Sequence, residues 1–350
     1  MGVCWLPEAG RTVSDLVKFG VGVPTATEGL MYPVPYASIG QAVELAIMTE
    51  ELGFDSVWGN DHIASQRYVQ AQFDEPPRYY DPLEFLAFVA AKTSRVRLAT
   101  CVIVLPFRHP VVAAKQLATL DQLSGGRLVA GVGIGAYREE FEALHPGVAL
   151  HRGRYAEEAI RSLRLLFTER RASFDGEYVH FTDVESYPKP WQTPLPILSG
   201  GNSAGSKDRA ARLGDGWLPA ALTPAEVAAG LSEIRKKAAD AGRELAAGFE
   251  VALQVGVAVG ATAEAARAQF ESSHIYTHMR SLSKSTLKDQ QIGDFAARNL
   301  IGTPDQIAEQ VRQYEAAGVN CLAGLLFAAN TMAETEEQIR LFRDEVMVRF

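Results

Sequence analysis

The strongest constraint on the fold is a strand–helix–strand unit that spans residues 97–135. Two apolar runs, residues 98–105 and 128–134, enclose a segment in which apolar side chains recur at three- and four-residue steps. Gly125-Gly126 ends that segment just before the second run. Parallel strands require a crossover of this kind, and strands buried on both faces consist of continuous apolar runs. The unit therefore predicts two neighbouring parallel strands joined by a helix.

The second apolar run ends in the glycine-rich sequence GVGIG, residues 131–135. Such glycines let a ligand approach the backbone closely. A dinucleotide site, however, needs a helix that begins at once, and here residues 136–138 intervene. We therefore expect no classical dinucleotide site, and tight packing inside a barrel explains the glycines equally well.

Short apolar runs and helical segments alternate along the rest of the chain. The eight expected strands cover residues 17–24, 54–58, 98–105, 128–134, 196–199, 217–218, 249–259 and 320–327. This alternation is typical of α/β folds with a parallel sheet. Because no compositional break divides the chain into two halves, we prefer a (β/α)8 TIM barrel to a doubly wound open sheet.

Several segments fall outside this alternation. We expect an N-terminal extension over residues 1–16, followed by a single domain over 17–350 with insertions at about 63–81, 171–195 and 261–298. The first insertion is polar and aromatic, lacks periodicity and is too long for an ordinary connection, so it is a candidate lid. Asp175-Gly176 predicts a β-hairpin within the second insertion.

Composition excludes several classes of function. A net charge of -8 argues against nucleic acid or an anionic membrane as the main partner. No apolar run approaches the roughly 20 residues of a membrane span, and the first 16 residues lack the apolar core of a secretion signal. The three cysteines are widely spaced and form no metal-ligand pattern with the histidines. We therefore expect a cytoplasmic protein without a metal site.

The carboxyl ends of barrel strands share one rim, where active sites lie. Four segments with chemically distinctive residues are predicted to converge there: Asp61-His62, Cys101-Val102, residues 133–136 and residues 200–203. His62 is a candidate acid or base, although a neutral histidine fixed by hydrogen bonds would give the same pattern. The small residues at 200–203 suit a phosphate, although a plain strand-to-helix turn would also use them.

Five segments resemble the superfamily of bacterial luciferase-like flavin enzymes. They are ELGFDSVWGNDH (51–62), LSGGRLVAGVGIG (123–135), RYAEEAIRSLRLLF (154–167), SGGNSAGSKDRAARLGDGW (199–217) and GTPDQIAEQVRQYEAAGV (302–319). Members of the superfamily are flavin monooxygenases or oxidoreductases that use the deazaflavin coenzyme F420. The resemblance extends from residue 17 almost to the C-terminus and implies a barrel with a flavin-type cofactor at the strand ends.

The resemblance also implies a set of site residues. Asp61 and His62 become the candidate catalytic residues. The cofactor would contact Cys101, Val102, Gly133, Ile134, Gly135, Ala136, Tyr155, Ser199, Gly200, Gly201, Asn202 and Ser203. Within this set, the resemblance implies a non-proline cis peptide between Cys101 and Val102, and a phosphate held by Tyr155 and the loop at 200–203.

The resemblance leaves the reaction open between alternatives. Coenzyme F420 is favoured, with hydride transfer to or from, or oxygenation of, a small organic substrate. The first alternative is an FMN-dependent monooxygenase served by a separate flavin reductase, and the second is a non-catalytic flavin-binding barrel. The sugar-phosphate dehydrogenases of the deazaflavin branch carry an acid where this chain has Ala136. The nearest acids are Glu139 and Glu140; together with Glu142 they are expected on a solvated face unless one of them turns into the pocket. A homodimer or larger homo-oligomer is also expected.

Overall fold

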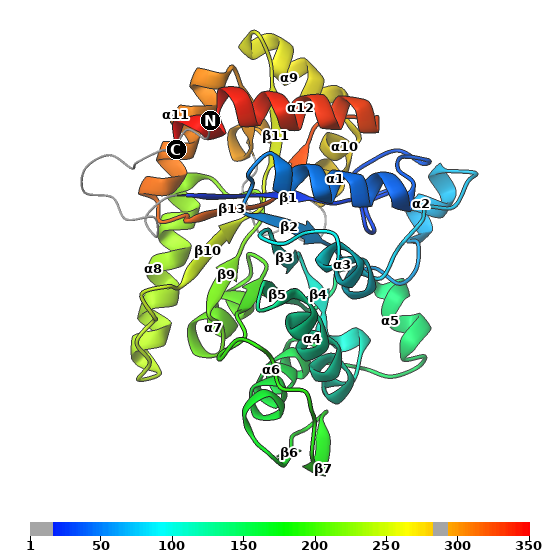
Figure 1. Cartoon of the computed structure of the whole chain (residues 1–350), viewed down its shortest axis with the longest axis vertical. Coiled ribbons are helices and arrows are strands. Elements are labelled where there is room, and N and C mark those ends of the chain that lie inside the picture. Colours follow the sequence, from blue (N-terminus) through cyan, green and yellow to red (C-terminus); the bar gives the residue numbers. More distant parts are fainter. Residues whose placement is uncertain (1–16, 283–292) are drawn as a thin grey trace.

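The computed structural model describes residues 17–282 and 293–350. Eight parallel strands close a barrel around which the helices pack (Figure 1). In barrel order the strands are β1 Lys18–Gly22, β2 Ser56–Gly59, β3 Arg97–Thr100, β5 Leu128–Gly133, β8 Ile197–Gly200, β9 Gly216–Leu218, β10 Glu250–Leu253 and β13 Cys321–Phe327. Pairing of β13 with β1 completes the closure. The predicted (β/α)8 barrel is therefore confirmed. The expected extension over residues 1–16 lies outside the described residues, as does part of the insertion expected at 261–298.

The helices that follow the strands form the outer layer. They are α1 Ile39–Glu51, α3 Pro82–Ala90, α4 Pro110–Ser124, α6 Arg152–Thr168, α7 Ala204–Arg212, α8 Pro224–Asp240, α11 Pro304–Ala316 and α12 Met332–Glu345. Thr223 and Thr303 form the capping boxes that start α8 and α11. Gly125 ends α4 in the left-handed conformation, at φ 66°, which a glycine adopts without steric cost.

The third expected strand is interrupted in its middle. Residues 98–105 form β3 and a separate two-residue strand, β4 Ile103–Val104, and both pair with β5. The peptide bond between Cys101 and Val102, which separates them, is cis. The predicted cis peptide is therefore confirmed, and it lies at the carboxyl end of β3.

The seventh expected strand, residues 249–259, is likewise not one continuous strand in the structure. It divides into β10 and β11 Gly256–Val259, and β11 pairs with both β13 and β12 Leu300–Gly302. The sequence analysis missed β12, because three residues are too few to show a strand pattern. The intervening chain forms α9 Ala263–Ser272 and α10 His274–Leu282. The insertion thus begins and ends beside the barrel sheet.

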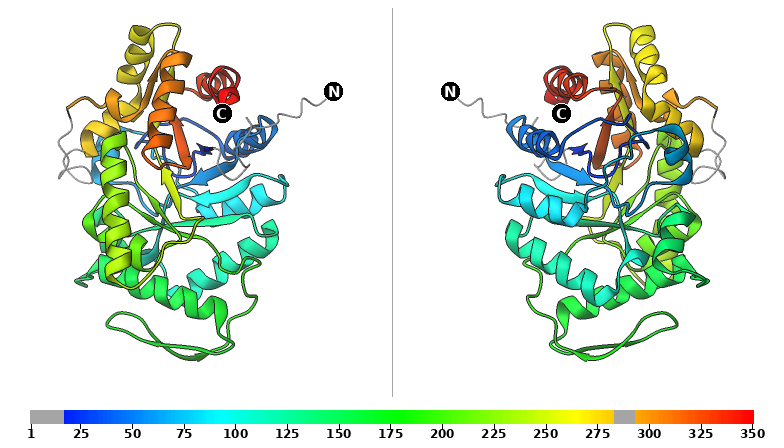
Figure 2. Two further views of the ribbon diagram at one scale, coloured as in Figure 1. Left: turned by 90° about the vertical axis from the view of Figure 1, so that its left-hand side faces the viewer. Right: turned by 90° about the vertical axis from the view of Figure 1, so that its right-hand side faces the viewer.

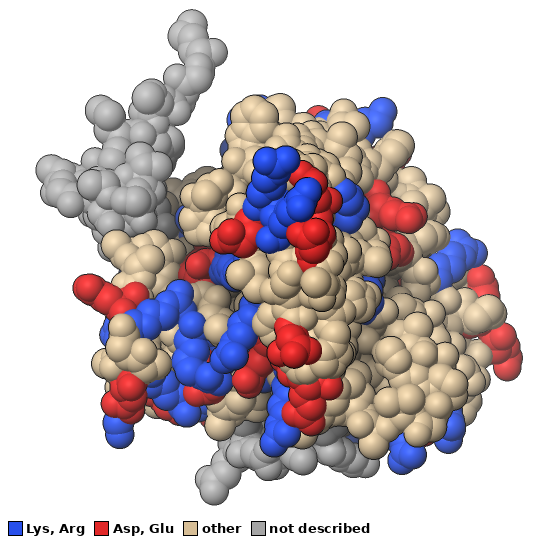
Figure 3. Space-filling view, turned by 90° about the horizontal axis from the view of Figure 1, so that it is seen from below, with Lys and Arg blue, Asp and Glu red and all other residues tan. Residues whose placement is uncertain are grey.

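Two peripheral elements lie at opposite ends of the molecule (Figures 1 and 2). The predicted hairpin is confirmed as an antiparallel pair, β6 Ala172–Asp175 and β7 His180–Val184, whereas α9 lies at the other end. Around the hairpin, positive and negative side chains alternate, including the pair Arg170–Glu185 at 3.3 Å (Figure 3). This face carries mixed charge rather than a surface of one sign.

The barrel interior is filled by one large side chain and several small ones. Trp58 is 2% exposed and packs with Ala99, Ala252 and Ala323 in an interior cluster distinct from the core beneath the helices. At the amino-terminal end of the strands, Arg97 reaches across to Glu250 with an N–O distance of 2.9 Å. The interior is therefore packed at its centre and closed by an ion pair at one end.

We predict that Gly131→Ala destabilises the barrel. A Cβ at this position in β5 would lie 2.0 Å from the Thr100 carbonyl oxygen, so the neighbouring strand must shift. We expect the free energy of unfolding to fall by about 1–3 kcal/mol, as for other overpacked interiors. Urea denaturation measures the change. The control is Gly40→Ala in α1, where a Cβ has 3.8 Å of clearance and the helix should gain stability. Equal denaturation midpoints for the two variants would contradict the prediction.

Candidate active site

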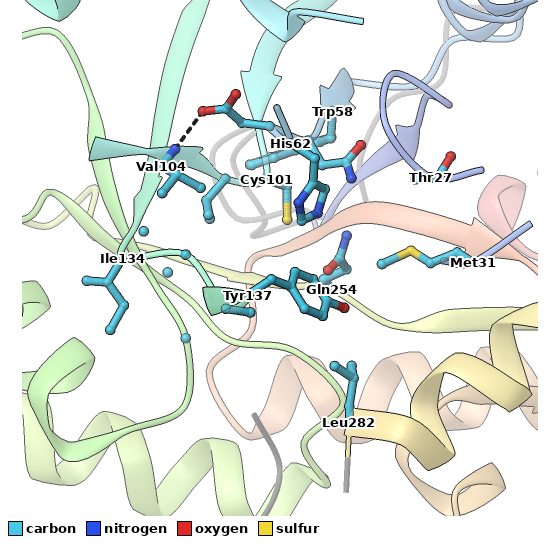
Figure 4. Close-up of a pocket in the computed structure, with 18 of the residues that line it drawn as sticks. Thr27, Met31, Trp58, His62, Cys101, Val104, Ile134, Tyr137, Gln254 and Leu282 are labelled. Carbon is cyan, nitrogen blue, oxygen red and sulfur yellow. Dashed lines mark hydrogen bonds between the residues drawn. The ribbon is translucent and has the colours of Figure 1, made fainter. Parts of the chain in front are cut away.

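A cavity of about 610 Å³ lies at the carboxyl ends of the barrel strands (Figure 4). Most of the predicted site residues line it, and they come from four separate segments. They are Asp61, His62, Cys101, Val102, Gly133, Ile134, Gly135, Ala136, Gly200, Gly201, Asn202 and Ser203. The sequence prediction that these segments converge on one rim is therefore confirmed as a spatial arrangement.

The Val102 side chain fills the space beside two glycines. A Cβ at Gly133 would lie 2.4 Å from Val102 Cγ2, and a Cβ at Gly200 would lie 2.6 Å from Val102 Cγ1. Packing therefore requires glycine at both positions, because only a residue without a side chain fits against the valine. Val102 itself lines the cavity together with Cys101. Three strands thus meet at a small, smooth apolar surface.

Asp61 is held by hydrogen bonds within the protein. It is 3% exposed, and its carboxylate accepts from the Val104 amide at 2.9 Å and from Arg108 Nη1 at 2.6 Å. Figure 4 shows the bond to Val104 as a dashed line. Arg108 Nη2 binds the second carboxylate oxygen at 3.2 Å. Because both oxygens are engaged, Asp61 serves to join the end of β2 to β4 and so positions His62.

His62 is paired with an acid that the sequence analysis placed elsewhere. Its Nδ1 lies 3.1 and 3.2 Å from the two carboxylate oxygens of Glu140, which is fully buried in α5 Arg138–Leu144. The Ile63 amide donates to the same carboxylate at 2.9 Å. The expectation of a solvated face is therefore wrong for Glu140. The expectation failed because Glu140 points inward from a short helix in which charged residues outnumber apolar ones.

This pairing assigns a proton to one ring nitrogen of His62. An ionised carboxylate only accepts hydrogen bonds, so Nδ1, the ring nitrogen that faces Glu140, carries a proton. The ring lies between Tyr79 and Tyr137, with centroid distances of 5.7 and 5.6 Å. His62 and Tyr137 both border the cavity in Figure 4. The geometry therefore presents a histidine at the edge of the cavity that is fixed through its Nδ1.

A buried cation lies near the loop at 200–203. Ser203 caps α7, and the Arg209 side chain reaches back so that Nη1 lies 3.5 Å from where a Cβ at Gly205 would stand. Arg209 is 5% exposed, and burial lowers its pKa. Among the described residues its guanidinium makes no hydrogen bond or ion pair. An unpaired buried cation at a helix N-terminus is a site for an anion.

Arg152 adds a second cation to the cavity lining. Its Nη1 donates to the Gly135 carbonyl at 2.9 Å, and its guanidinium lies over the Phe141 ring at 4.7 Å from the centroid. Burial lowers its pKa as well. The sequence analysis missed both arginines. The sequence offered one indication of a role for Arg209: it lies six residues after Ser203, on the helix that begins at the loop.

Two predicted cofactor contacts do not line the cavity. The Tyr155 hydroxyl donates to the Arg108 carbonyl at 3.2 Å, and burial raises the pKa of Tyr155 to about 12. Ser199 is buried, and its hydroxyl donates to the Ser206 carbonyl at 2.9 Å. Ser199 thus ties the end of β8 to α7, whereas Tyr155 ties α6 to the segment that precedes α4. Direct contact with a cofactor stays a prediction for each.

The cavity also has a wall that the sequence analysis left undefined. We define the α10 wall as Val23, Thr27, Met31, His278, Leu282 and Leu326. These residues come from the β1–α1 loop, α10 and β13, and the loop and the insertion lack any periodic signal that would reveal a binding role. Figure 4 shows Thr27 and Met31 on the side of the cavity away from Ile134. Thr27 and Met31 thus lie across the cavity from Ile134.

Two further features concern the described chain as a whole. Within residues 17–282 and 293–350, no helix combines the length and apolar character that a membrane crossing needs. Over the same residues, no group of three or more His, Cys, Asp or Glu side chains is arranged to hold a metal ion.

Comparison with known proteins identifies the class of enzyme. The family model for luciferase-like monooxygenases matches residues 17–321, so the chain belongs to this family of enzymes. An FMNH2-dependent dimethylsulfone monooxygenase of Pseudomonas putida is 30% identical over an alignment of 344 positions, gaps included, that covers 90% of this chain and 92% of the relative. An F420-dependent glucose-6-phosphate dehydrogenase of Kineococcus radiotolerans is 37% identical over 184 residues, about half of each chain (51% and 52%).

Solved structures agree with the fold. Monooxygenase RslO1 from Streptomyces bottropensis matches with a TM-score of 0.75 and 26% identity, over 95% of this chain and 99% of its own. An F420-dependent secondary alcohol dehydrogenase matches with a TM-score of 0.74 at 19% identity, over 95% and 98% of the two chains. At that identity the second match speaks for the fold alone.

We predict that Glu140→Ala destabilises the site, because it leaves the His62 Nδ1 and the Ile63 amide without their acceptor. The expected loss in the free energy of unfolding is about 1–3 kcal/mol, measured by urea denaturation. Glu142→Ala is the control, since Glu142 lies on the same helix in exposed pairs with Arg67 and Arg138. In wild type, ¹⁵N NMR should show the Nδ1–H tautomer of His62. An Nε2–H tautomer would contradict the assignment.

Proposed function

We propose that this chain is a flavin-dependent oxidoreductase that holds the cofactor phosphate at residues 200–203 and Arg209, with the ring beside Cys101-Val102. The observation that carries the proposal is Arg209, a buried residue whose guanidinium reaches back toward the start of α7 and makes no hydrogen bond or ion pair among the described residues. The two acids that act on its charge, Glu157 and Asp208, are both paired with Arg212. A phosphate supplies the missing counter-charge, and the free amides at the helix N-terminus supply further donors.

The residues beside this anion site suit a flat ring. Val102 occupies the space that side chains at Gly133 and Gly200 would need, so the three strand ends leave a smooth surface. When bound, a reduced flavin supplies a hydride or activates molecular oxygen for transfer of one atom to a substrate. The protein contributes His62 Nε2, which accepts or returns a proton at the reacting centre. Glu140 and Asp61 hold that histidine in place.

Reduced FMN is our first candidate for the cofactor. A second cavity of about 490 Å³ shares Asn202 and Ser203 with the first and is lined by Lys207, Glu226 and Glu233. Lys207 is already paired with Glu233. Glu226 is paired in turn with Arg298 at 2.6 Å, so the carboxylates of this cavity are matched by cations and give no charge argument against the acidic tail of coenzyme F420. FMN ends at its phosphate and makes no use of the second cavity.

The similarity over nearly the whole chain to an FMNH2-dependent monooxygenase supports the same choice. The preference therefore moves from coenzyme F420, which the sequence analysis favoured, to FMN. Coenzyme F420 is the second candidate, supported by the 37% identity to an F420-dependent dehydrogenase over half of the chain. In the FMN case a separate flavin reductase is the expected partner. A cytoplasmic location and a homo-oligomeric state complete the proposal.

We predict that Arg209→Met weakens FMN binding by about 10–100-fold, because one charge-assisted contact with the phosphate is lost. Titration followed by flavin fluorescence measures the affinity. Riboflavin lacks the phosphate, so its affinity should not change. The control is Arg212→Met on the same helix, where the arginine is paired with Glu157 at 3.4 Å. Parallel titrations with coenzyme F420 decide between the cofactors. Equal losses for FMN and riboflavin would refute the phosphate site.

We predict that His62→Ala lowers turnover by about 10²–10⁴-fold, as expected for loss of a general acid or base. Turnover is measured with reduced FMN supplied by an added flavin reductase and a panel of small sulfones, ketones and alkanes. FMN affinity should stay near the wild-type value, whereas the melting temperature should fall moderately, as in Glu140→Ala, because the buried Glu140 carboxylate loses its His62 partner. His180→Ala is the control, since His180 lies on the hairpin and pairs with Asp175 at 2.8 Å. Full turnover, or unfolding of His62→Ala, would show a structural role instead.

A further inference from the structure

Two buried polar atoms on the α10 wall lack hydrogen-bond partners. Thr27 is 4% exposed and His278 is 6% exposed. Within the described part of the chain, neither Thr27 Oγ1 nor His278 Nδ1 has a donor or acceptor in range. Buried polar atoms are nearly always paired, and an unpaired one reduces stability. Because both residues line the same cavity, a ligand in that cavity is the natural partner for both.

The backbone around each residue is fixed. The Thr27 carbonyl accepts from the Met31 amide at 2.8 Å, which holds the β1–α1 loop in a tight turn. At the start of α10, the His274 amide donates to Asn330 Oδ1 at 3.1 Å, and the His274 ring packs on Phe73 with centroids 5.6 Å apart. His278 follows one helical turn later. The two unpaired atoms are therefore presented by anchored elements rather than by free ends.

The α10 wall is otherwise uncharged. Its other members are Val23, Met31, Leu282 and Leu326, and it includes no Lys, Arg, Asp or Glu. Burial lowers the pKa of His278 to about 3, and the nearby His62 and His274 act in the same direction. His278 is therefore neutral at pH 7, with one donor and one acceptor nitrogen. The cations of the cavity, Arg152 and Arg209, belong to the proposed phosphate end.

We propose that Thr27 and His278 together bind the oxygen of an uncharged substrate, a ketone or an alcohol with an apolar body that packs on the α10 wall. A carbonyl oxygen accepts from the Thr27 hydroxyl and from the imidazole, whereas a hydroxyl donates to one and accepts from the other. The inference deepens the proposed function, since it assigns the substrate end of the cavity whose other end would hold the flavin. Anionic substrates gain no countercharge from this wall.

Matched probes test this class of substrate directly. Cyclohexanone and cyclohexanol carry the oxygen, methylenecyclohexane keeps the shape without it, and cyclohexanecarboxylate adds a charge. Saturation-transfer NMR on the protein, with and without FMN, measures their affinities. We expect the ketone or the alcohol to bind about tenfold more tightly than methylenecyclohexane, which corresponds to one net hydrogen bond. Equal affinities, or tightest binding of the carboxylate, would overturn the proposal.

Variants then assign the preference to the two residues. Thr27→Val keeps the shape and removes the hydroxyl, and His278→Phe removes both ring nitrogens. Each should abolish most of the preference for the oxygen-bearing probes. The control is Ser162→Ala in α6, because Ser162 also has an unpaired buried hydroxyl but does not line the cavity. It should keep the preference. An unchanged preference in Thr27→Val would overturn the proposal even if His278→Phe fails to fold.

A second measurement separates this inference from the proposed function. Removing an unpaired buried hydroxyl should raise the melting temperature of the free protein in both Thr27→Val and Ser162→Ala. A lower melting temperature in Thr27→Val would show that the hydroxyl already has a partner and would overturn the inference. FMN affinity should be equal in wild type and Thr27→Val. Failure of wild type to bind any flavin refutes the proposed function alone, because the probe preference is measured without FMN as well.

Discussion

The position of the Trp58 indole inside the barrel fixes where the interior ends and the cavity begins. Its Nε1 donates to Ser56 Oγ at 2.8 Å, so the ring is held within its own strand. A Cβ at Gly20 would lie 2.3 Å from that nitrogen, and one at Gly324 would lie 3.2 Å from Trp58 Cβ. The tryptophan therefore fits in the barrel only because Gly20 and Gly324 have no side chains. Because Trp58 also lines the cavity, this packing sets the floor on which a ligand would rest.

The two ends of the barrel divide structural and chemical tasks. At the amino-terminal end, Glu250 receives Arg97 and Lys18; although burial opposes its ionisation, these two cations keep its pKa below the usual value. The charges there satisfy one another. At the carboxyl end, by contrast, Arg209 and the polar atoms of the α10 wall are left without partners among the described residues. Unsatisfied groups thus occur where ligands bind in barrels of this class, although others, such as Ser162 Oγ, lie away from the cavity.

The fold was largely predictable because its signals are local. Apolar runs, the caps at Thr223 and Thr303, and the turn at Asp175-Gly176 each act within a few residues. The rim residues followed from topology, since strand ends must converge. Glu140 and Arg209 did not follow, because a short polar helix and a helix with charges on several faces do not reveal which side chain turns inward. The α10 wall was hidden for a similar reason: its members lie on a loop and an insertion whose packing only the tertiary structure specifies.

The contact of Val102 with Gly133 and Gly200 has a consequence for how such a site changes during evolution. Either glycine can gain a side chain only if residue 102 becomes smaller, since the valine methyl groups already occupy the space. A smaller residue at 102 alone, in turn, would leave a void where packing was complete. Single substitutions are therefore disfavoured in both directions. The three positions lie at the break between β3 and β4, in β5 and in β8, and they are expected to vary together, so that alternative shapes of this surface are reached by paired changes.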